Sequence, residues 1–213
     1  MDHFSYKDGE LYAEDVAIAK IAGEVGTPFY CYSTATLVRH YNVLADVFKN
    51  IQSTICFAVK ANSNIAVLKT LANLGAGADT VSEGEIRRAI SAGIAPKKIV
   101  FSGIGKTKAE IEYALKLGIM QFNVESETEL LTINNIAKKL GKKACVSFRV
   151  NPDVDAGTHD KIATGRKGDK FGIAWDSAKE IYKQASSLPN IDVAGVSTHI
   201  GSQLTDLEPF RIA

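Results

Sequence analysis

The sequence has few of the residues that characterise secreted, membrane-spanning or metal-binding proteins. Its 213 residues include only 3 cysteines and 4 histidines, and no two cysteines stand in a Cys-x-x-Cys pair. This scarcity predicts reduced, buried thiols and no metal site. No apolar run approaches the length of a membrane span. The first residues lack the basic and apolar regions of a secretory signal. We therefore expect a cytoplasmic protein.

An excess of charge of one sign is also absent. The chain has 25 Lys and Arg against 24 Asp and Glu, a net charge of +1, and no basic run stands out. This balance provides no electrostatic argument for binding to nucleic acid or to an anionic membrane. The composition, 46% hydrophobic and 23% charged, is ordinary for a globular protein. A chain of this length can bury a core as one domain or form part of a larger one.

From residue 55 onward, strand-like apolar runs alternate with helix-like segments. Three helices are expected to begin at capping boxes, formed by Ser82 with Glu85, Thr107 with Glu110, and Ser126 with Glu129. Glycine is expected to end the helices, at Gly75, Gly93, Gly118 and Gly141. The six expected strands are 55–59, 77–81, 98–101, 120–124, 144–150 and 193–198. This alternation predicts βαβ crossovers and a parallel sheet.

Other segments lead to separate expectations. We expect a helix over residues 16–22 that ends near Gly23, a strand over 27–32, and a helix from Asp176 or Ser177 to about Leu188. Residues 151–170 have no apolar period and include His159. Because a loop of this length in a compact domain is usually functional, we expect an active-site loop there.

The stretch from Ile55 to Asn64 joins an apolar run to a lysine and then to helix-start residues. Lys60 follows the run directly, and Asn62, Ser63 and Asn64 follow Lys60. A desolvated amine has a lowered pKa and becomes a nucleophile towards carbonyls, including an aldehyde cofactor. The alternative is that Lys60 is simply the first exposed residue after a strand.

Polar or ionisable groups follow all six expected strands. Because ligands of parallel α/β folds bind beyond the carboxyl ends of the strands, these groups predict one shared pocket. They are Lys60, Asp79, Ser102, Glu125, Arg149 with Asn151, and His199.

Each of these groups also has a structural alternative. Asp79 could have a role only in the turn before the next helix. Glu125 could stabilise the dipole of the following helix. Arg149 could form a buried structural ion pair. His199 could be a satisfied histidine. Gly201 and Ser202, at an expected helix start, could form either a cap or a phosphate site.

The segment Gly103–Thr107 (GIGKT) is similar to the end of a nucleotide-binding P-loop. That motif needs a glycine five residues before Gly105, and Val100 stands there. We therefore reject this interpretation.

Six motifs follow one another along the chain: Phe57–Asn62 (FAVKAN), Gly77–Glu85 (GADTVSEGE), Phe101–Gly103 (FSG), Phe148–Pro152 (FRVNP), Lys170–Gly172 (KFG) and His199–Gln203 (HIGSQ). Together they resemble those of pyridoxal-phosphate-dependent decarboxylases with an alanine-racemase-like barrel. The loop at 151–172 resembles the branch acting on diaminopimelate more than the branches acting on ornithine or arginine.

The resemblance implies decarboxylation of meso-2,6-diaminopimelate to L-lysine and carbon dioxide, with pyridoxal 5'-phosphate as cofactor. By position, Lys60 matches the lysine that holds the cofactor, and His199 matches the histidine stacked on its ring. Ser202 matches a serine at the phosphate, and Asp79 and Arg149 match residues lining the pocket.

The resemblance also implies a (β/α)8 TIM-type barrel followed by a β-domain, in a homodimer. Only six barrel strands are expected here, so we expect residues 27–213 to form a partial cofactor-binding barrel. Residues 1–26 would join the β-domain. The family's later glycine-rich phosphate loop and Glu-Pro-Gly-Arg segment do not occur in the sequence. We therefore expect an N-terminal portion of such an enzyme, inactive by itself.

Three alternatives remain open at this stage. The first is another decarboxylase or racemase of the same barrel class, acting on ornithine, arginine or alanine. The second is a non-catalytic barrel protein that binds pyridoxal phosphate. The third is a degenerate homologue that acts through protein contacts, although such a chain would be expected to have lost Lys60 or His199.

Overall fold

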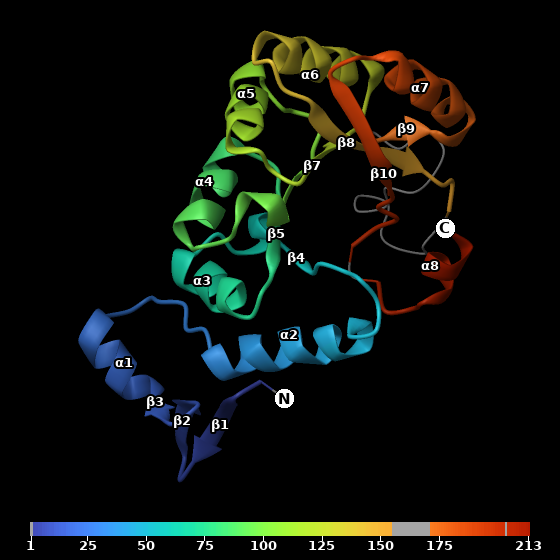
Figure 1. The fold of residues 1–213 in the computed structure, drawn as a ribbon. Coiled ribbons are helices and arrows are strands. Elements are labelled where there is room, and N and C mark those ends of the chain that lie inside the picture. Colours follow the sequence, from blue (N-terminus) through green and yellow to red (C-terminus); the bar gives the residue numbers. More distant parts are fainter. Residues whose placement is uncertain (1, 155–170, 203) are drawn as a thin grey trace.

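The computed structural model describes residues 2–154, 171–202 and 204–213. Within these residues, the dominant feature is a parallel sheet of βα units (Figure 1). Its strands are β4 (Cys56–Ala58), β5 (Gly77–Thr80), β6 (Ile99–Phe101), β7 (Gln121–Val124), β8 (Ala144–Asn151) and β10 (Ile191–Ser197), with the short β9 (Ile173–Ala174) beside β8. All six expected strands are therefore confirmed.

The sheet follows the order of the sequence. Its strand order is β10-β8-β7-β6-β5-β4, and every neighbouring pair is parallel. A doubly wound sheet would reverse direction at one point, whereas a barrel adds each new strand on the same side. The arrangement is that of an incomplete (β/α) barrel, as expected, of which about six strands are present.

Helices cover the outer face of the curved sheet (Figure 1). They are α3 (Ile65–Asn73), α4 (Glu83–Ser91), α5 (Lys108–Leu117), α6 (Glu127–Lys139) and α7 (Trp175–Ser187), and α2 (Thr34–Phe48) precedes the sheet. Two 3-10 turns, Val59–Ala61 and Pro96–Lys98, and the short α8 (Glu208–Ile212) complete this part. The helix ends at Gly93, Gly118 and Gly141 have positive φ, as expected of helix-ending glycines.

Only one of the three expected capping boxes is complete. Thr107 and Glu110 bond reciprocally at the start of α5. Ser82 and Ser126 each accept the expected bond from the backbone of the glutamate three residues on. The carboxylates of these two glutamates, however, accept from the N–H groups of Val81 and Glu125, one residue before the cap.

Aromatic residues of neighbouring strands fill the space between the sheet and the helices. Phe101, Phe122 and Phe148 are among the largest fully buried side chains. The rings of Phe101 and Phe122 lie 6.0 Å apart, and Phe148 meets Tyr182 of α7 edge-on at 4.8 Å. Burial on both faces explains why these strands appear as continuous apolar runs.

The N-terminal residues form a separate small sheet. The antiparallel strands β1 (Phe4–Lys7), β2 (Glu10–Ala13) and β3 (Val16–Ala17) lead into α1 (Ile18–Val25). The Glu14 carboxylate accepts hydrogen bonds from Ser33 Oγ and from the Ala35 N–H, which ties this part to the start of α2. The assignment of residues 1–26 to a second domain stays a prediction.

The structure corrects four expectations. The first helix runs on to Val25, so Gly23 lies inside it. Residues 27–32 form no strand, because they have no ladder partner among the described residues and Tyr30 is 89% exposed. Gly201 and Ser202 do not start a helix, since α8 begins at Glu208. The three cysteines are half-buried rather than buried. Of the expected loop at 151–170, residues 155–170, with His159, lie outside the described residues, and Asn151 belongs to β8.

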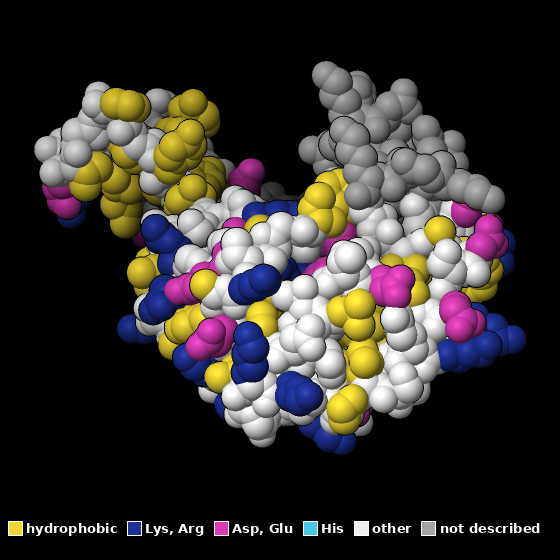
Figure 2. All heavy atoms as spheres, turned by 90° about the horizontal axis from the view of Figure 1, so that it is seen from above, with side chains coloured by type: hydrophobic (Ala, Val, Ile, Leu, Met, Phe, Trp, Pro, Cys, Tyr) yellow, Lys and Arg dark blue, Asp and Glu magenta, His cyan; other side chains and the backbone are white. Residues whose placement is uncertain are grey.

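Charges of both signs are interspersed on the face shown in Figure 2, which has no extended patch of one sign. Among the described residues, no group of three or more His, Cys, Asp or Glu side chains is placed to hold a metal ion. Within the same residues, no helix is long and apolar enough to cross a membrane.

Candidate functional site

A cavity of about 470 Å³ opens at the carboxyl ends of the parallel strands. Its volume lies within the range of roughly 300–1,000 Å³ that is typical of small-molecule sites. All five predicted site residues line it: Lys60, Asp79, Arg149, His199 and Ser202. A second cavity of about 430 Å³, beside Trp175 and Asp176, contains none of the five. The predicted shared pocket is therefore the first cavity, except that Glu125 is not in its lining and Asn151 lines the second cavity instead.

Lys60 reaches the cavity from the 3-10 turn that follows β4. Val59, next to it, is completely buried and anchors the turn in the core. Lys60 itself is exposed, and β4 is half-buried because it pairs only with β5 among the described strands. The exposed side chain agrees with the alternative in which Lys60 is the first exposed residue after a strand, and Lys60 also lies in the lining of the cavity.

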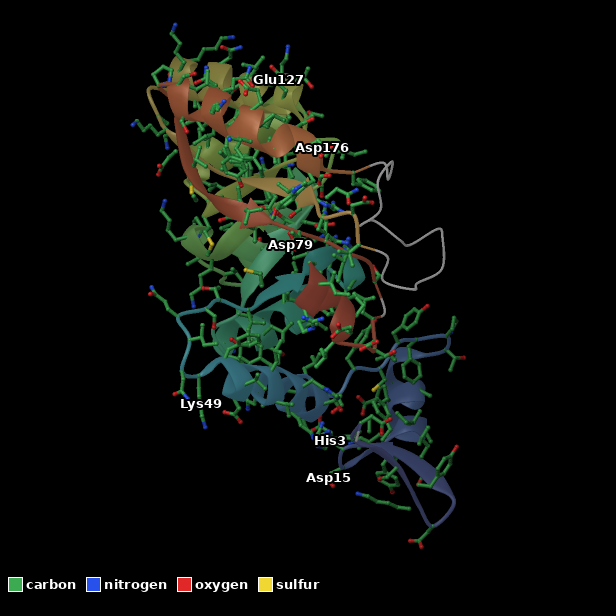
Figure 3. The ribbon with its side chains drawn as sticks, turned by 90° about the vertical axis from the view of Figure 1, so that its right-hand side faces the viewer. His3, Asp15, Lys49, Asp79, Glu127 and Asp176 are labelled. Atoms are coloured by element: carbon green, nitrogen blue, oxygen red, sulfur yellow. The ribbon has the colours of Figure 1, made fainter. Side chains whose placement is uncertain are left out.

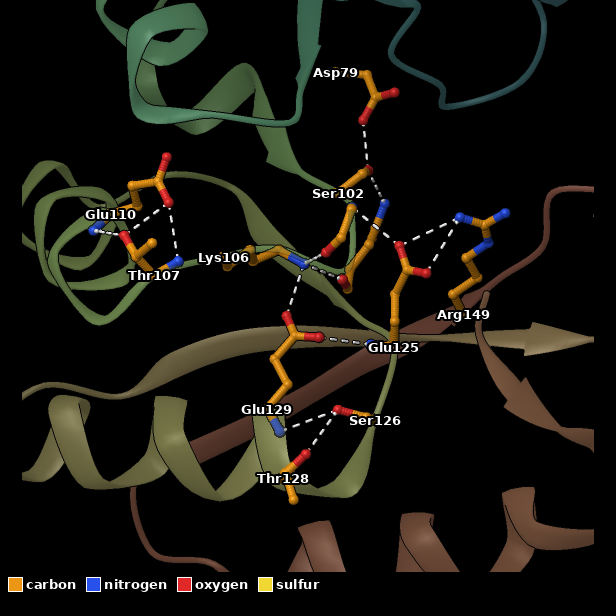
Figure 4. Close-up of polar contacts among 12 residues, drawn as sticks. Asp79, Ser102, Lys106, Thr107, Glu110, Glu125, Ser126, Thr128, Glu129 and Arg149 are labelled. Atoms are coloured by element: carbon orange, nitrogen blue, oxygen red, sulfur yellow. Dashed lines mark hydrogen bonds and ion pairs between the residues drawn. The ribbon is translucent and has the colours of Figure 1, made fainter. Parts of the chain in front are cut away.

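Asp79 is held by a chain of side-chain hydrogen bonds (Figure 4). Asn123 Nδ2 donates to Ser102 Oγ at 2.9 Å, and Ser102 Oγ donates to Asp79 Oδ1 at 2.6 Å. All three residues line the cavity, and Figure 3 shows Asp79 within the curved sheet. Because Asn123 donates to the Ser102 oxygen, the Ser102 proton is free to point at the carboxylate. The role of Asp79 is therefore not limited to the turn before α4, because its carboxylate is also bonded within the cavity wall.

Arg149 forms the buried ion pair that was one of its two alternatives. Its Nη1 lies 3.2 and 3.3 Å from the two carboxylate oxygens of Glu125, whose side chain is 1% exposed. The same carboxylate accepts the Gly103 N–H at 3.0 Å. The Arg149 guanidinium also lies over the Phe171 ring, 5.2 Å from its centre. Glu125 thus holds Arg149 at the cavity wall. This contact is separate from any effect of Glu125 on the dipole of α6.

His199 and Ser202 follow β10 and complete the wall. Burial lowers the pKa of the His199 imidazole, the positive charges of Arg149 and Lys60 lower it further, and Asp79 opposes them. The imidazole is therefore neutral at pH 7, a state suited to stacking on a flat ring. Ser202 is exposed in a bend, so its placement at the cavity does not depend on a helix start.

Lys106 was set aside with the rejected P-loop, yet it organises one side of the site. Its ammonium donates to the carbonyls of Gly103 and Asn123 at 2.5 and 2.8 Å and forms an ion pair with Glu129 at 2.7 Å (Figure 4). Burial raises the pKa of the Glu129 carboxyl, and the Lys106 charge acts against this rise. Sequence reasoning missed Lys106, Asn123 and Phe171 as site residues. Ser102 and Glu125 were indicated by their places at strand ends.

The groups that line the cavity fit pyridoxal phosphate. A primary amine suits the aldehyde, a neutral imidazole suits the ring, and a guanidinium and hydroxyls suit a phosphate or a carboxylate. One further polar atom is unsatisfied: Ser197 Oγ is buried and has no hydrogen-bond partner among the described residues. Ser197 lines the same cavity, so a polar ligand atom there would satisfy it.

Comparisons with known proteins agree with this chemistry. Residues 15–213 match the family described as "Pyridoxal-dependent decarboxylase, pyridoxal binding domain". The chain is 54% identical to the diaminopimelate decarboxylase of Vibrio cholerae over 99% of its own length and 51% of that protein. The chain therefore spans about half the length of the curated relatives it matches.

Solved structures show the same relationship. A crystal structure of diaminopimelate decarboxylase from M. jannaschii in complex with L-lysine matches with a TM-score of 0.90 and 41% identity, over 98% of this chain and 50% of that one. The Helicobacter pylori enzyme complexed with L-lysine matches with a TM-score of 0.87 and 48% identity, over 90% and 49% of the two chains.

Proposed function

This chain belongs to the family of pyridoxal-dependent decarboxylases, so its cofactor is pyridoxal 5'-phosphate, and on that premise we propose what the whole protein does. The proposal is that the protein removes carbon dioxide from meso-2,6-diaminopimelate to give L-lysine, the reaction implied by the name its relatives carry. The observation that carries the proposal is the convergence of Lys60, His199, Arg149, Asp79 and Ser202 on one cavity.

We further propose a role for each of these residues. Lys60 would hold the cofactor through its amine and afterwards move a proton at that nitrogen. His199, uncharged at neutral pH, would lie against the ring, and Ser202 would donate its hydroxyl to the phosphate. Asp79 and Arg149 would orient polar groups of the ligand, because Ser102 and Glu125 hold them in place. When bound, pyridoxal phosphate supplies the electron sink for the electron pair left behind when carbon dioxide departs.

Trapping of the cofactor tests this proposal directly. We expect pyridoxal phosphate added to the purified chain to develop the visible absorbance of a lysine-linked pyridoxal. Borohydride reduction should then fix the cofactor to the peptide that contains Lys60, as read by mass spectrometry. Lys60→Ala should abolish this label, whereas Lys49→Ala, at a lysine outside the lining of this cavity, should not. A label spread over many surface lysines would contradict the site assignment.

The substrate is tested separately from the cofactor. Carbon dioxide release should be measured from diaminopimelate, ornithine and arginine, and racemisation from alanine, with the gene product that carries these residues. We expect release from diaminopimelate alone. Turnover of ornithine, arginine or alanine instead would assign the protein to another branch of the barrel class, with the cofactor assignment unchanged.

The resemblance also supports two proposals about the setting of the protein. One is a homodimer, because sites of this family use residues of both subunits, and sedimentation equilibrium would measure it. The other is a location in the cytoplasm. Three free cysteines fit a reducing compartment, and cell fractionation would test this assignment.

A further inference from the structure

The cavity wall between β6 and β7 lies beyond the end of their hydrogen-bonded ladder. The register of these strands ends at the pair of Phe101 with Phe122. The next residues, Ser102 and Gly103 on one side and Asn123 on the other, line the cavity. No further pair of this ladder joins the two strand ends to each other.

The Lys106 ammonium bridges the two ends. It donates at 2.5 Å to the Gly103 carbonyl, beyond β6, and at 2.8 Å to the Asn123 carbonyl, within β7. Its third partner is the Glu129 carboxylate on α6, at 2.7 Å. The ammonium thus has two carbonyl acceptors and one carboxylate as its counter-ion.

The burial of this ion pair is by itself weak evidence for a stabilising role. The Lys106 and Glu129 side chains are 1% and 10% exposed. A buried ion pair is often no more stabilising than apolar side chains of the same size, and its better attested use is to specify one arrangement. The arrangement specified here is the spacing of the two strand ends.

That spacing controls the hydrogen bonds on the cavity side. Asn123 Nδ2 and Ser102 Oγ, 2.9 Å apart, belong to the two bridged segments, and Ser102 passes the contact on to Asp79 at 2.6 Å. Both backbone polar groups of Gly103 are bonded, since Lys106 donates to its carbonyl and Glu125 accepts from its N–H. A shift of either strand end would break the chain that orients Asp79.

We propose that Lys106, with Glu129 as its counter-ion, is a positioning residue of this site. It fixes the ends of β6 and β7 so that Asn123 and Ser102 hold the Asp79 carboxylate in its orientation towards the ligand. Its effect on the cofactor rests on the proposed function. Its effect on Asp79 does not.

The test compares two pairs of substitutions that each remove one positive and one negative charge. Lys106→Met with Glu129→Gln removes the bridge. Lys116→Met with Glu112→Gln removes an exposed ion pair of α5, with side chains 59% and 47% exposed, and serves as the matched control. Ser102→Ala breaks the chain to Asp79 and leaves the bridge intact.

Two measurements report on each variant. The first is the His199 titration midpoint by NMR in the chain without cofactor, because the Asp79 charge raises the pKa of His199. The second is the affinity for pyridoxal phosphate by absorbance. We expect the bridge variant and Ser102→Ala each to lower the His199 midpoint. The two changes combined in one chain should lower it no further. We also expect both variants to bind pyridoxal phosphate about tenfold more weakly, the cost of one lost charge-assisted hydrogen bond. The control should match the wild type in both measurements.

A folded bridge variant with the wild-type His199 midpoint would overturn the proposal. If that variant does not fold, Lys106→Gln with Glu129→Gln takes its place, since a neutral amide lacks the ammonium that bonds both carbonyls, and a wild-type midpoint there overturns the proposal equally. If the midpoints shift as expected while the wild-type chain binds no pyridoxal phosphate, the proposed function fails and the positioning role stands.

Discussion

Nη1 of Arg149 lies within 3.3 Å of both carboxylate oxygens of Glu125, and the Glu125 side chain is 1% exposed. Each charged group replaces the water that the other loses on burial. Removal of one group therefore leaves the other charge without its partner at the cavity wall. The Gly103 N–H would lose its acceptor at the same time.

We therefore expect Glu125→Ala to destabilise the chain strongly. Removal of one partner of a buried pair costs about 3–5 kcal/mol, and the lower end applies because the Arg149 side chain is 15% exposed and keeps some contact with water. Urea unfolding measures the loss. Glu112→Ala, in an exposed pair, should cost less than about 1 kcal/mol. Similar losses in the two variants would show that the Arg149–Glu125 pair is not set apart by its burial.

The second prediction concerns pH. Burial, aided by Arg149 and Lys60, lowers the pKa of His199 in the folded chain. The unfolded chain then binds more protons between the folded pKa and the unfolded value of about 6.5, so stability falls as the pH drops through this window. His199→Asn should remove this part of the pH dependence. Melting temperatures of both chains at pH 8 and below pH 6 test the sign, and an unchanged difference would contradict it.

The third prediction concerns the close approach of β5 to its neighbours. A Cβ atom on Gly77 would lie 2.3 Å from the Lys98 carbonyl oxygen and 2.8 Å from Cys56 Sγ. We expect Gly77→Ala to destabilise the chain by at least about 1–3 kcal/mol, because the nearest obstacle is backbone.

For a second glycine, Gly23, we expect substitution by alanine to change the stability in the opposite direction. Gly23 lies inside α1 with nothing within 4 Å of its added Cβ. Gly23→Ala should therefore stabilise the chain by about 0.5–1 kcal/mol. Urea unfolding compares the two variants, and a shift in the same direction for both would refute the steric argument.

The fourth prediction concerns Cys56. Burial, with a smaller effect of the Asp79 charge, raises the pKa of this thiol to about 11. At pH 8 only about one thiol in a thousand is then the reactive thiolate. Iodoacetamide labelling followed by peptide mass spectrometry should find Cys56 protected in the folded chain and labelled in urea. Asp79→Asn should speed the labelling, and an unchanged rate would exclude the electrostatic contribution.

The alternation of strands and helices could be predicted because its signals are local. A buried apolar run, a Ser or Thr cap and a terminal glycine each act within a few residues, and all six strands follow them. The expected strand at residues 27–32 failed because a strand also needs a neighbour. No local signal in Tyr30 or Tyr32 shows that a neighbour is lacking.

The site could be predicted in part for the same reason. Residues that directly follow strands, such as Asp79 and Arg149, reach the cavity as a consequence of parallel topology. The pairing of Lys106 with Glu129 joins the loop after β6 to a helix after β7. A single sequence shows such a pairing only as two separate local features, a glycine-rich loop and a capping box, and each has an adequate local explanation.

The open edges of the parallel sheet have a consequence for handling the purified chain. Among the described strands, β4 and β10 each have one ladder partner in sheet order, so each leaves a row of backbone amide and carbonyl groups unpaired. Such rows are templates for strands of other molecules. With a net charge of +1, little electrostatic repulsion keeps two copies apart. Concentrated solutions of this chain are therefore prone to self-association through the edges of β4 and β10.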